Sequence, residues 1–134
     1  PKLLVSSQTR VLEVVADPSG ELLGSVPVVV VRPRDPADVW RLAAALTAPT
    51  ASAWLLRRSA GTARSADACR PTAALLSALP LPTDRPAWDA AADLAERASR
   101  GGAPVHEVAA AAERAYRTGD PGVRTWWERR RPQR

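Results

Sequence analysis

The alternation of apolar and polar positions divides the chain into a β-rich first part and a helical remainder. Residues 2–33 hold short apolar runs rich in β-branched side chains, interrupted at 17–20 by DPSG, which suits a type I turn. The run from Val28 to Val31 lacks alternation and predicts a strand covered on both faces. We therefore predict a hairpin followed by one or two further strands.

The apolar period changes to that of a helix after this β-rich part. Asp35 suits an N-cap and Pro36 the first helical position, and apolar residues recur at helical spacing as far as Leu46. The next helical segment is short and is expected to end at Gly61, a suitable C-terminal cap. Residues 71–79 predict a further helical turn or two.

The proline-rich stretch LPLPTDRPAW at 79–88 predicts a stiff joint rather than a site of chemistry. Leu79 and Leu81 are expected to be buried on one side, while the prolines hold the backbone extended. Asp84 suits an N-cap and Pro86 the start of a helix of about four turns.

A glycine-containing break ends that helix, and Pro104 opens the next one. Two helices joined by so short a loop predict an antiparallel helical hairpin. In the remaining tail, Trp126 and Trp127 predict one amphipathic turn, after which we expect the chain to fray.

These elements predict an α+β fold. A small, mostly antiparallel sheet from the N-terminal third is packed with helices and is followed by a C-terminal helical hairpin. The predicted organisation is an α+β domain over 1–85, a helical hairpin over 86–118 packed on it, and a basic tryptophan-containing tail over 119–134.

Composition narrows the class of protein. The net charge is +5, with 18 Arg and one Lys, which is compatible with a nucleic-acid partner but also with an arginine-rich codon usage. The single cysteine, Cys69, allows no internal disulfide and favours a reduced, cytoplasmic setting. No apolar run reaches the eighteen or so residues of a membrane span, so we expect no membrane partner. Because the chain begins at Pro1, inside a predicted strand, we expect it to be part of a longer protein.

The search for catalytic chemistry favours binding over catalysis. His106 falls in the first turn of an amphipathic helix, and Cys69 has no neighbour in sequence that would activate its thiol. No glycine loop has the spacing of a phosphate-binding motif. Three polar stretches, 6–10, 57–65 and the basic tail, are candidate binding surfaces. Their alternative interpretations are a turn between strands, a solvated helix end and a solubilising terminus.

Several stretches, taken in order, carry a resemblance to a known family. They are KLLV at 2–5, AALTAPTASAWLL at 44–56, the glycine loop SAGTARSA at 59–66, and LPLP at 79–82. Over roughly residues 1–85, their order and spacing resemble the C-terminal region of bacterial N-6 adenine DNA methyltransferases, above all actinobacterial, restriction-modification-like members. The layout is also similar to the target-recognition domains of type I restriction specificity subunits.

The resemblance implies that this chain docks double-stranded DNA and selects its sequence, without transferring the methyl group itself. The family's Asn-Pro-Pro-Tyr/Phe motif and a cofactor-binding glycine motif are absent, so the resemblance places S-adenosylmethionine and the methyl transfer in an upstream methylase domain of the same protein. No active site, cofactor or metal is expected within these residues. The family's LNSP pattern has Thr47 and Ala48 in place of its Asn and Ser, so no base-contacting residue is transferred by position.

Candidate DNA contacts come instead from residue chemistry, because Arg and Gln can bind base edges bidentately and Ser can hold phosphates. The candidates are Ser7, Gln8, Arg10, Arg57, Arg58, Arg64 and Arg85. The alternative hypothesis is a protein-interaction or dimerisation domain with no nucleic-acid role, in which the hairpin with Trp88 and the Trp126–Trp127 pair dock on a partner or a second copy.

Overall fold

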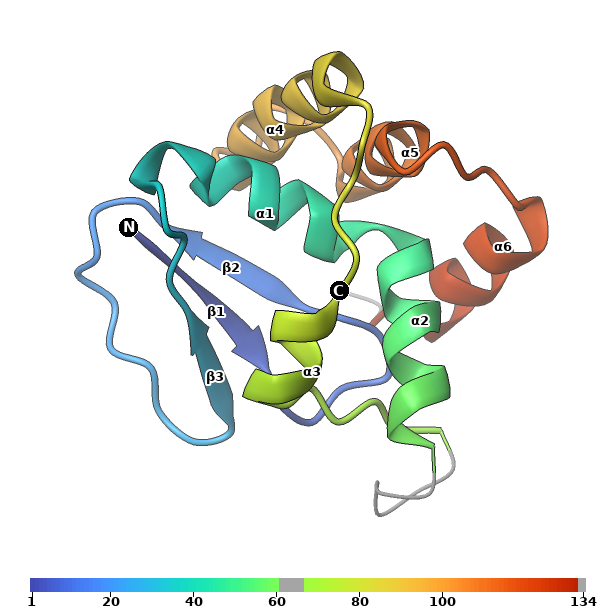
Figure 1. Ribbon diagram of the computed structural model, residues 1–134, viewed down its shortest axis with the longest axis horizontal. Coiled ribbons are helices and arrows are strands. Elements are labelled where there is room, and N and C mark those ends of the chain that lie inside the picture. Colours follow the sequence, from blue (N-terminus) through green and yellow to red (C-terminus); the bar gives the residue numbers. More distant parts are fainter. Residues whose placement is uncertain (61–66, 133–134) are drawn as a thin grey trace.

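The computed structural model describes residues 1–60 and 67–132, and it confirms the α+β class. Three antiparallel strands form a sheet in the order β2-β1-β3, with β1 in the centre (Figure 1). The strands are β1 Lys2–Ser6, β2 Val14–Asp17 and β3 Val28–Val31. Their register places Leu4 of β1 opposite Val15 on one side and Val30 on the other.

A run of helices follows the sheet. The elements are η1 Pro36–Asp38, α1 Val39–Thr47, α2 Pro49–Ser59, α3 Ala73–Ala78, α4 Arg85–Ser99, α5 Val105–Ala115 and α6 Pro121–Arg130. The predicted helix end at Gly61 and the candidate Arg64 lie outside the described residues. Within residues 1–60 and 67–132, no helix is long and apolar enough to cross a membrane.

Several helices begin where a short polar side chain caps the first turn. Asp35 accepts a hydrogen bond from the backbone N of Ala37 at 2.9 Å, and Asp84 accepts one from Ala87 at 3.2 Å. Asp120 does the same for Gly122 at 2.7 Å. Each of these aspartates has a proline in the first helical positions that follow, where the missing N–H costs nothing.

The core lies between one face of the sheet and the helices. Leu3 and Val5 of β1 are fully buried and alternate with half-buried neighbours, as a one-sided sheet requires. Helix α1 packs on this face, and the predicted hairpin of α4 and α5 packs on α1 (Figure 1). One apolar cluster therefore runs from Leu3 of the sheet to Ala112 of α5.

The other face of the sheet is open, so the prediction that Val28–Val31 is covered on both faces is wrong. Val30 of β3 and Val15 of β2, which flank Leu4 on opposite sides, are exposed, because both lie on edge strands and helices cover only the face of Leu3. The segment before β3 crosses the open face at Gly24. A Cβ added there would lie 3.0 Å from a Val30 methyl carbon, so a larger residue would displace this side chain and the close approach favours glycine.

The proline-rich stretch is a packed joint. Leu79 is buried as predicted, whereas Leu81 is exposed, which corrects the expectation that both are covered. Tyr116, at the end of α5, donates its hydroxyl hydrogen to the carbonyl oxygen of Pro80 at 2.8 Å. The joint is thus held by the hairpin that it introduces.

The tail differs most from its prediction. Instead of one turn that frays, α6 is a helix of 10 residues. Trp127 is only 2% exposed and packs against Val11 and Ala109. The expectation fails because α6 is stabilised by tertiary packing: its own Trp127 is buried against residues far away in sequence, although the helix is otherwise mostly polar.

Acid is expected to destabilise the fold through Asp17 at the end of β2. Burial alone would raise the pKa of this carboxyl group, but hydrogen bonds from the Leu22 backbone N and Lys2, with further bonds from the turn, lower it to about 2. A carboxyl group whose pKa is lower in the folded state stabilises that state above its unfolded pKa. This contribution should therefore be lost as the pH falls from 3.8 towards about 2.

The measurement is urea unfolding at a series of pH values for the wild type and Asp17→Asn. The variant should lose the part of the pH dependence that falls in this window. Identical pH profiles for the two proteins would contradict the assignment to Asp17.

Candidate nucleic-acid interface

The turn between β1 and β2 is held rigidly and presents polar side chains outward. Thr9 pairs with Cys69 through two backbone hydrogen bonds of 3.4 and 2.6 Å. Leu12 donates its backbone N–H to the Ser52 hydroxyl of α2 at 3.0 Å. Gln8 and Arg10 are exposed on this fixed turn. Their side chains are therefore displayed on a backbone that is ordered before any ligand arrives.

Ser7 has a different position from these two neighbours. It is half-buried, and its backbone N donates to the carbonyl oxygen of Pro27 at 2.9 Å. Ser7 thus ties the turn to the segment that leads into β3.

Two further predicted DNA contacts, Arg57 and Arg58, lie at the C-terminal end of α2. Arg57 and Arg58 are both exposed in its last turn. The Arg58 guanidinium lies over the Trp54 ring, 4.1 Å from its centroid. Neither arginine forms an ion pair with any described residue. Both charges interact favourably with the helix C-terminus and remain open to an anionic partner.

Helix α6 brings basic residues to this region; the sequence analysis counted the basic tail among the candidate surfaces but named none of its residues as contacts. Figure 1 shows α6 beside α2, and the Thr50 and Thr118 hydroxyls, 3.0 Å apart, join the start of α2 to the segment before α6. Further along, Trp127 packs against Val11 of the β1–β2 turn. In the sequence, the N-cap Asp120 and the stretch RTWWERRR indicate a basic helix. They do not indicate which part of the protein this helix packs against.

The buried carboxylate of Glu113 on α5 strengthens this junction. It accepts the backbone N–H of Thr50 at 2.9 Å and lies 3.3 Å from the Thr118 hydroxyl. The start of α2 and the segment before α6 are thus fixed to the same side chain.

A shallow, open groove of about 520 Å³ follows the outer face of α6. Its lining consists of Pro121, Gly122, Thr125, Trp126, Arg129 and Arg130. Arg129 is exposed and forms no ion pair with a described residue. A surface so open, with a hydroxyl group, an aromatic ring and guanidinium groups, suits contact with a polymer better than enclosure of a small molecule.

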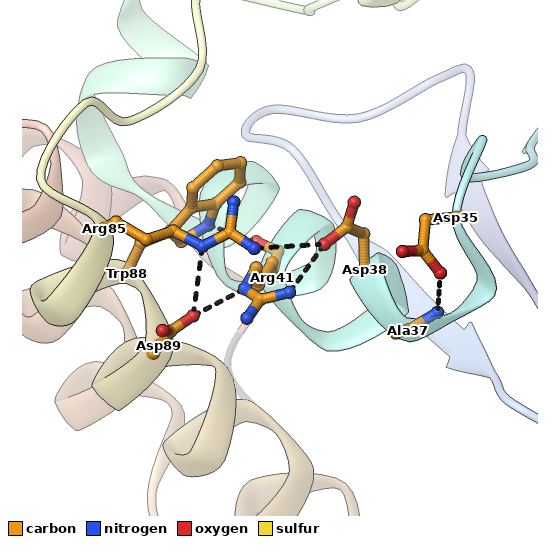
Figure 2. Close-up of polar contacts among 7 residues, drawn as sticks. All are labelled: Asp35, Ala37, Asp38, Arg41, Arg85, Trp88 and Asp89. Atoms are coloured by element: carbon orange, nitrogen blue, oxygen red, sulfur yellow. Dashed lines mark hydrogen bonds and ion pairs between the residues drawn. The ribbon is translucent and has the colours of Figure 1, made fainter.

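Arg85 lies elsewhere, in a charge-balanced cluster at the start of α4 (Figure 2). Its guanidinium is 3.9 Å from Asp38 and 3.5 Å from Asp89. Arg41 pairs with the same two carboxylates at 2.7 and 2.5 Å. The hydrogen bond from Arg41 is the main reason why the pKa of Asp89 is lowered. The structure therefore does not bring Arg85 together with the turn, α2 or α6, and its role as a phosphate contact stays a prediction.

The residues suited to catalysis are not assembled into a site within the described ranges. His106 is exposed in the first turn of α5, whereas Cys69 is buried beside the β1–β2 turn. Burial raises the pKa of the Cys69 thiol, which makes it less reactive, although the nearby Arg130 charge acts in the opposite direction. Across residues 1–60 and 67–132, no cluster of three His, Cys, Asp or Glu is placed to hold a metal ion.

No protein-family model matches the chain, and no curated protein or solved structure is significantly similar to it. The functional argument therefore depends on the geometry and charge of the residues themselves.

Proposed function

We propose that this chain is a double-stranded DNA-binding module that selects a sequence for a larger enzyme. One observation carries the proposal: three segments far apart in sequence contact one another and all carry exposed basic side chains. We call these side chains, Arg10 of the turn, Arg57 and Arg58 of α2, and Arg129 of α6, the basic surface. None of these four guanidinium groups has an ion-pair partner among the described residues.

The two kinds of segment suit two kinds of DNA contact. Helical arginines with free guanidinium groups suit phosphates, which supply affinity without sequence information. Gln8 and Arg10 are the side chain types that bind adenine and guanine edges bidentately. Because hydrogen bonds to Cys69 and Ser52 fix their turn, little ordering would be required on binding.

The larger enzyme in this proposal is an N-6 adenine DNA methyltransferase of a restriction-modification-like system. The support is the resemblance of residues 1–85, whose quoted stretches lie in β1, in α1 and α2, and in the proline joint, with most of the glycine loop outside the described residues. An upstream domain would bind S-adenosylmethionine and transfer the methyl group, while this module would hold the duplex.

Salt dependence tests the proposal. We expect the association constant for a short duplex, measured by fluorescence anisotropy, to fall steeply from about 50 mM to about 200 mM salt. The double variant Arg57→Gln/Arg58→Gln removes two phosphate contacts. It should lower affinity roughly tenfold and reduce the log–log salt slope by about two.

The matched control is Arg97→Gln/Arg100→Gln on α4, which removes the same charge from exposed positions elsewhere. This control should change affinity and slope far less. The proposal fails where the wild type shows no salt-dependent binding, or where the control loses as much as the α2 variant.

The structure removes two of the three tryptophans of the alternative hypothesis from a docking surface, because Trp88 is 8% exposed and Trp127 is buried. Trp126 is half-buried and lines the groove on α6, so the protein-interaction alternative stays a prediction. Homodimer formation stays a prediction, which light scattering on the purified chain can test.

A further inference from the structure

Arg130 differs from Arg129, its exposed neighbour on α6, because its side chain is only 12% exposed and all three guanidinium nitrogens have hydrogen-bond partners. Its Nε donates to the carbonyl oxygen of Arg10 at 3.2 Å. Its Nη1 donates to the Asp67 carboxylate at 3.4 Å, and its Nη2 donates to the Asp67 carbonyl oxygen. The plane also faces the Trp126 ring, 5.2 Å from its centroid.

These bonds join two segments that are also paired with each other. The Arg10 carbonyl oxygen, in the β1–β2 turn, accepts from Arg130 and lies 3.6 Å from the Cys69 sulfur. Asp67 lies two positions before Cys69, which pairs with Thr9 of the same turn. Arg130 thus closes a bridge between α6, the turn and the segment that leads to α3.

We propose that Arg130 is a positioning residue for DNA contact. It holds the backbone of Arg10, so that Gln8 and Arg10 face the duplex in one orientation, and it does not itself bind a phosphate. This inference rests on the proposed DNA-binding function. Its physical basis is that a carbonyl oxygen held by a guanidinium with several partners fixes the peptide plane, and hence the direction of the adjoining side chains.

Cys69 provides a test of the structural half of the proposal that needs no DNA. It is the single cysteine of the chain and is 1% exposed, so its reaction with an aromatic disulfide reagent reports opening of the bridged segments. Arg130→Ala in the full chain should raise the reaction rate at least roughly tenfold. Loss of the charge alone would slow the reaction, since Arg130 lowers the thiol pKa, so a faster rate can only report exposure.

Two variants make this test decisive. Arg129→Ala, at the exposed neighbouring position, should leave the rate of Cys69 modification unchanged. Arg130→Gln keeps two N–H donors and should fall between the wild type and Arg130→Ala. Circular dichroism checks that each variant is folded. An unchanged rate in folded Arg130→Ala, or the same increase in Arg129→Ala, would overturn the positioning role.

DNA binding tests the functional half. Arg130→Ala should weaken duplex binding without changing the salt slope, whereas Arg129→Ala should reduce the slope by about one. A slope reduced equally by both variants would show that Arg130 binds a phosphate and would overturn the inference. If the wild type binds no DNA, the proposed function fails and the assigned role fails with it, even where Cys69 shows that Arg130 holds the turn.

Discussion

Replacing Trp127 by alanine is expected to lower the free energy of unfolding by about 3–5 kcal/mol. The ring is almost completely buried on α6 and packs against Val11 of the β1–β2 turn and Ala109 of α5. Its removal leaves a cavity between elements that cannot collapse easily, because backbone hydrogen bonds fix the turn. Equilibrium unfolding in guanidinium chloride, followed by circular dichroism, measures the loss.

Two further variants serve as controls for the Trp127→Ala measurement. Trp127→Phe keeps most of the ring volume and should cost much less than alanine. Val26→Ser changes a side chain that is 95% exposed and should stay within about 0.5 kcal/mol of the wild type. A loss below about 1 kcal/mol for Trp127→Ala would show that α6 is not docked as described.

We expect a comparable loss of about 3–5 kcal/mol for Trp88→Ala at the start of α4. Trp88 packs against Ala45 of α1 and Ala115 of α5, and its indole N–H donates to the carbonyl oxygen of Arg41 at 2.6 Å. It therefore fixes the hairpin to the helix that covers the sheet (Figure 2). The same unfolding experiment measures the effect.

Trp88→Phe separates packing from hydrogen bonding, because it removes the N–H and keeps an aromatic ring. The lost hydrogen bond should cost about 1 kcal/mol. Arg85→Ala, which removes an exposed member of the adjacent ion-pair cluster, should cost no more than about 1 kcal/mol. Equal losses for Arg85→Ala and Trp88→Ala would contradict the view that packing dominates here.

Local sequence signals predicted most of the elements. Asp35 with Pro36, and Asp84 with Pro86, announce helix starts that the structure confirms, because N-caps and proline act within one turn. The hairpin of α4 and α5 followed from apolar spacing and a glycine break. These features are determined by residues close together in the sequence, so they can be predicted from one sequence alone.

The errors all concern contacts between distant segments. An apolar run such as Val28–Val31 fits either a central or an edge strand, and only the sheet order decides. Helix α6 has a polar sequence, and its stability comes from Trp127 meeting Val11. Among the candidate contacts, Gln8 and Arg10 were proposed from their chemistry, and the structure exposes both side chains on the turn. The ion pair of Arg85 with Asp89 has the i,i+4 spacing of one helix face, whereas its pair with Asp38 was not foreseeable, since Asp38 lies on another helical element.

The contact between α6 and the β1–β2 turn also bears on the order of folding. Arg130 and Arg10 bond across 120 positions, whereas α4 and α5 meet through a short loop. Closing so long a loop costs conformational entropy, which is offset only when both the β1–β2 turn and α6 are already formed. We therefore expect α6 to dock late in folding. During synthesis, the turn leaves the ribosome well before α6 exists. Until then, Val11 and its neighbours are open to solvent and to other chains.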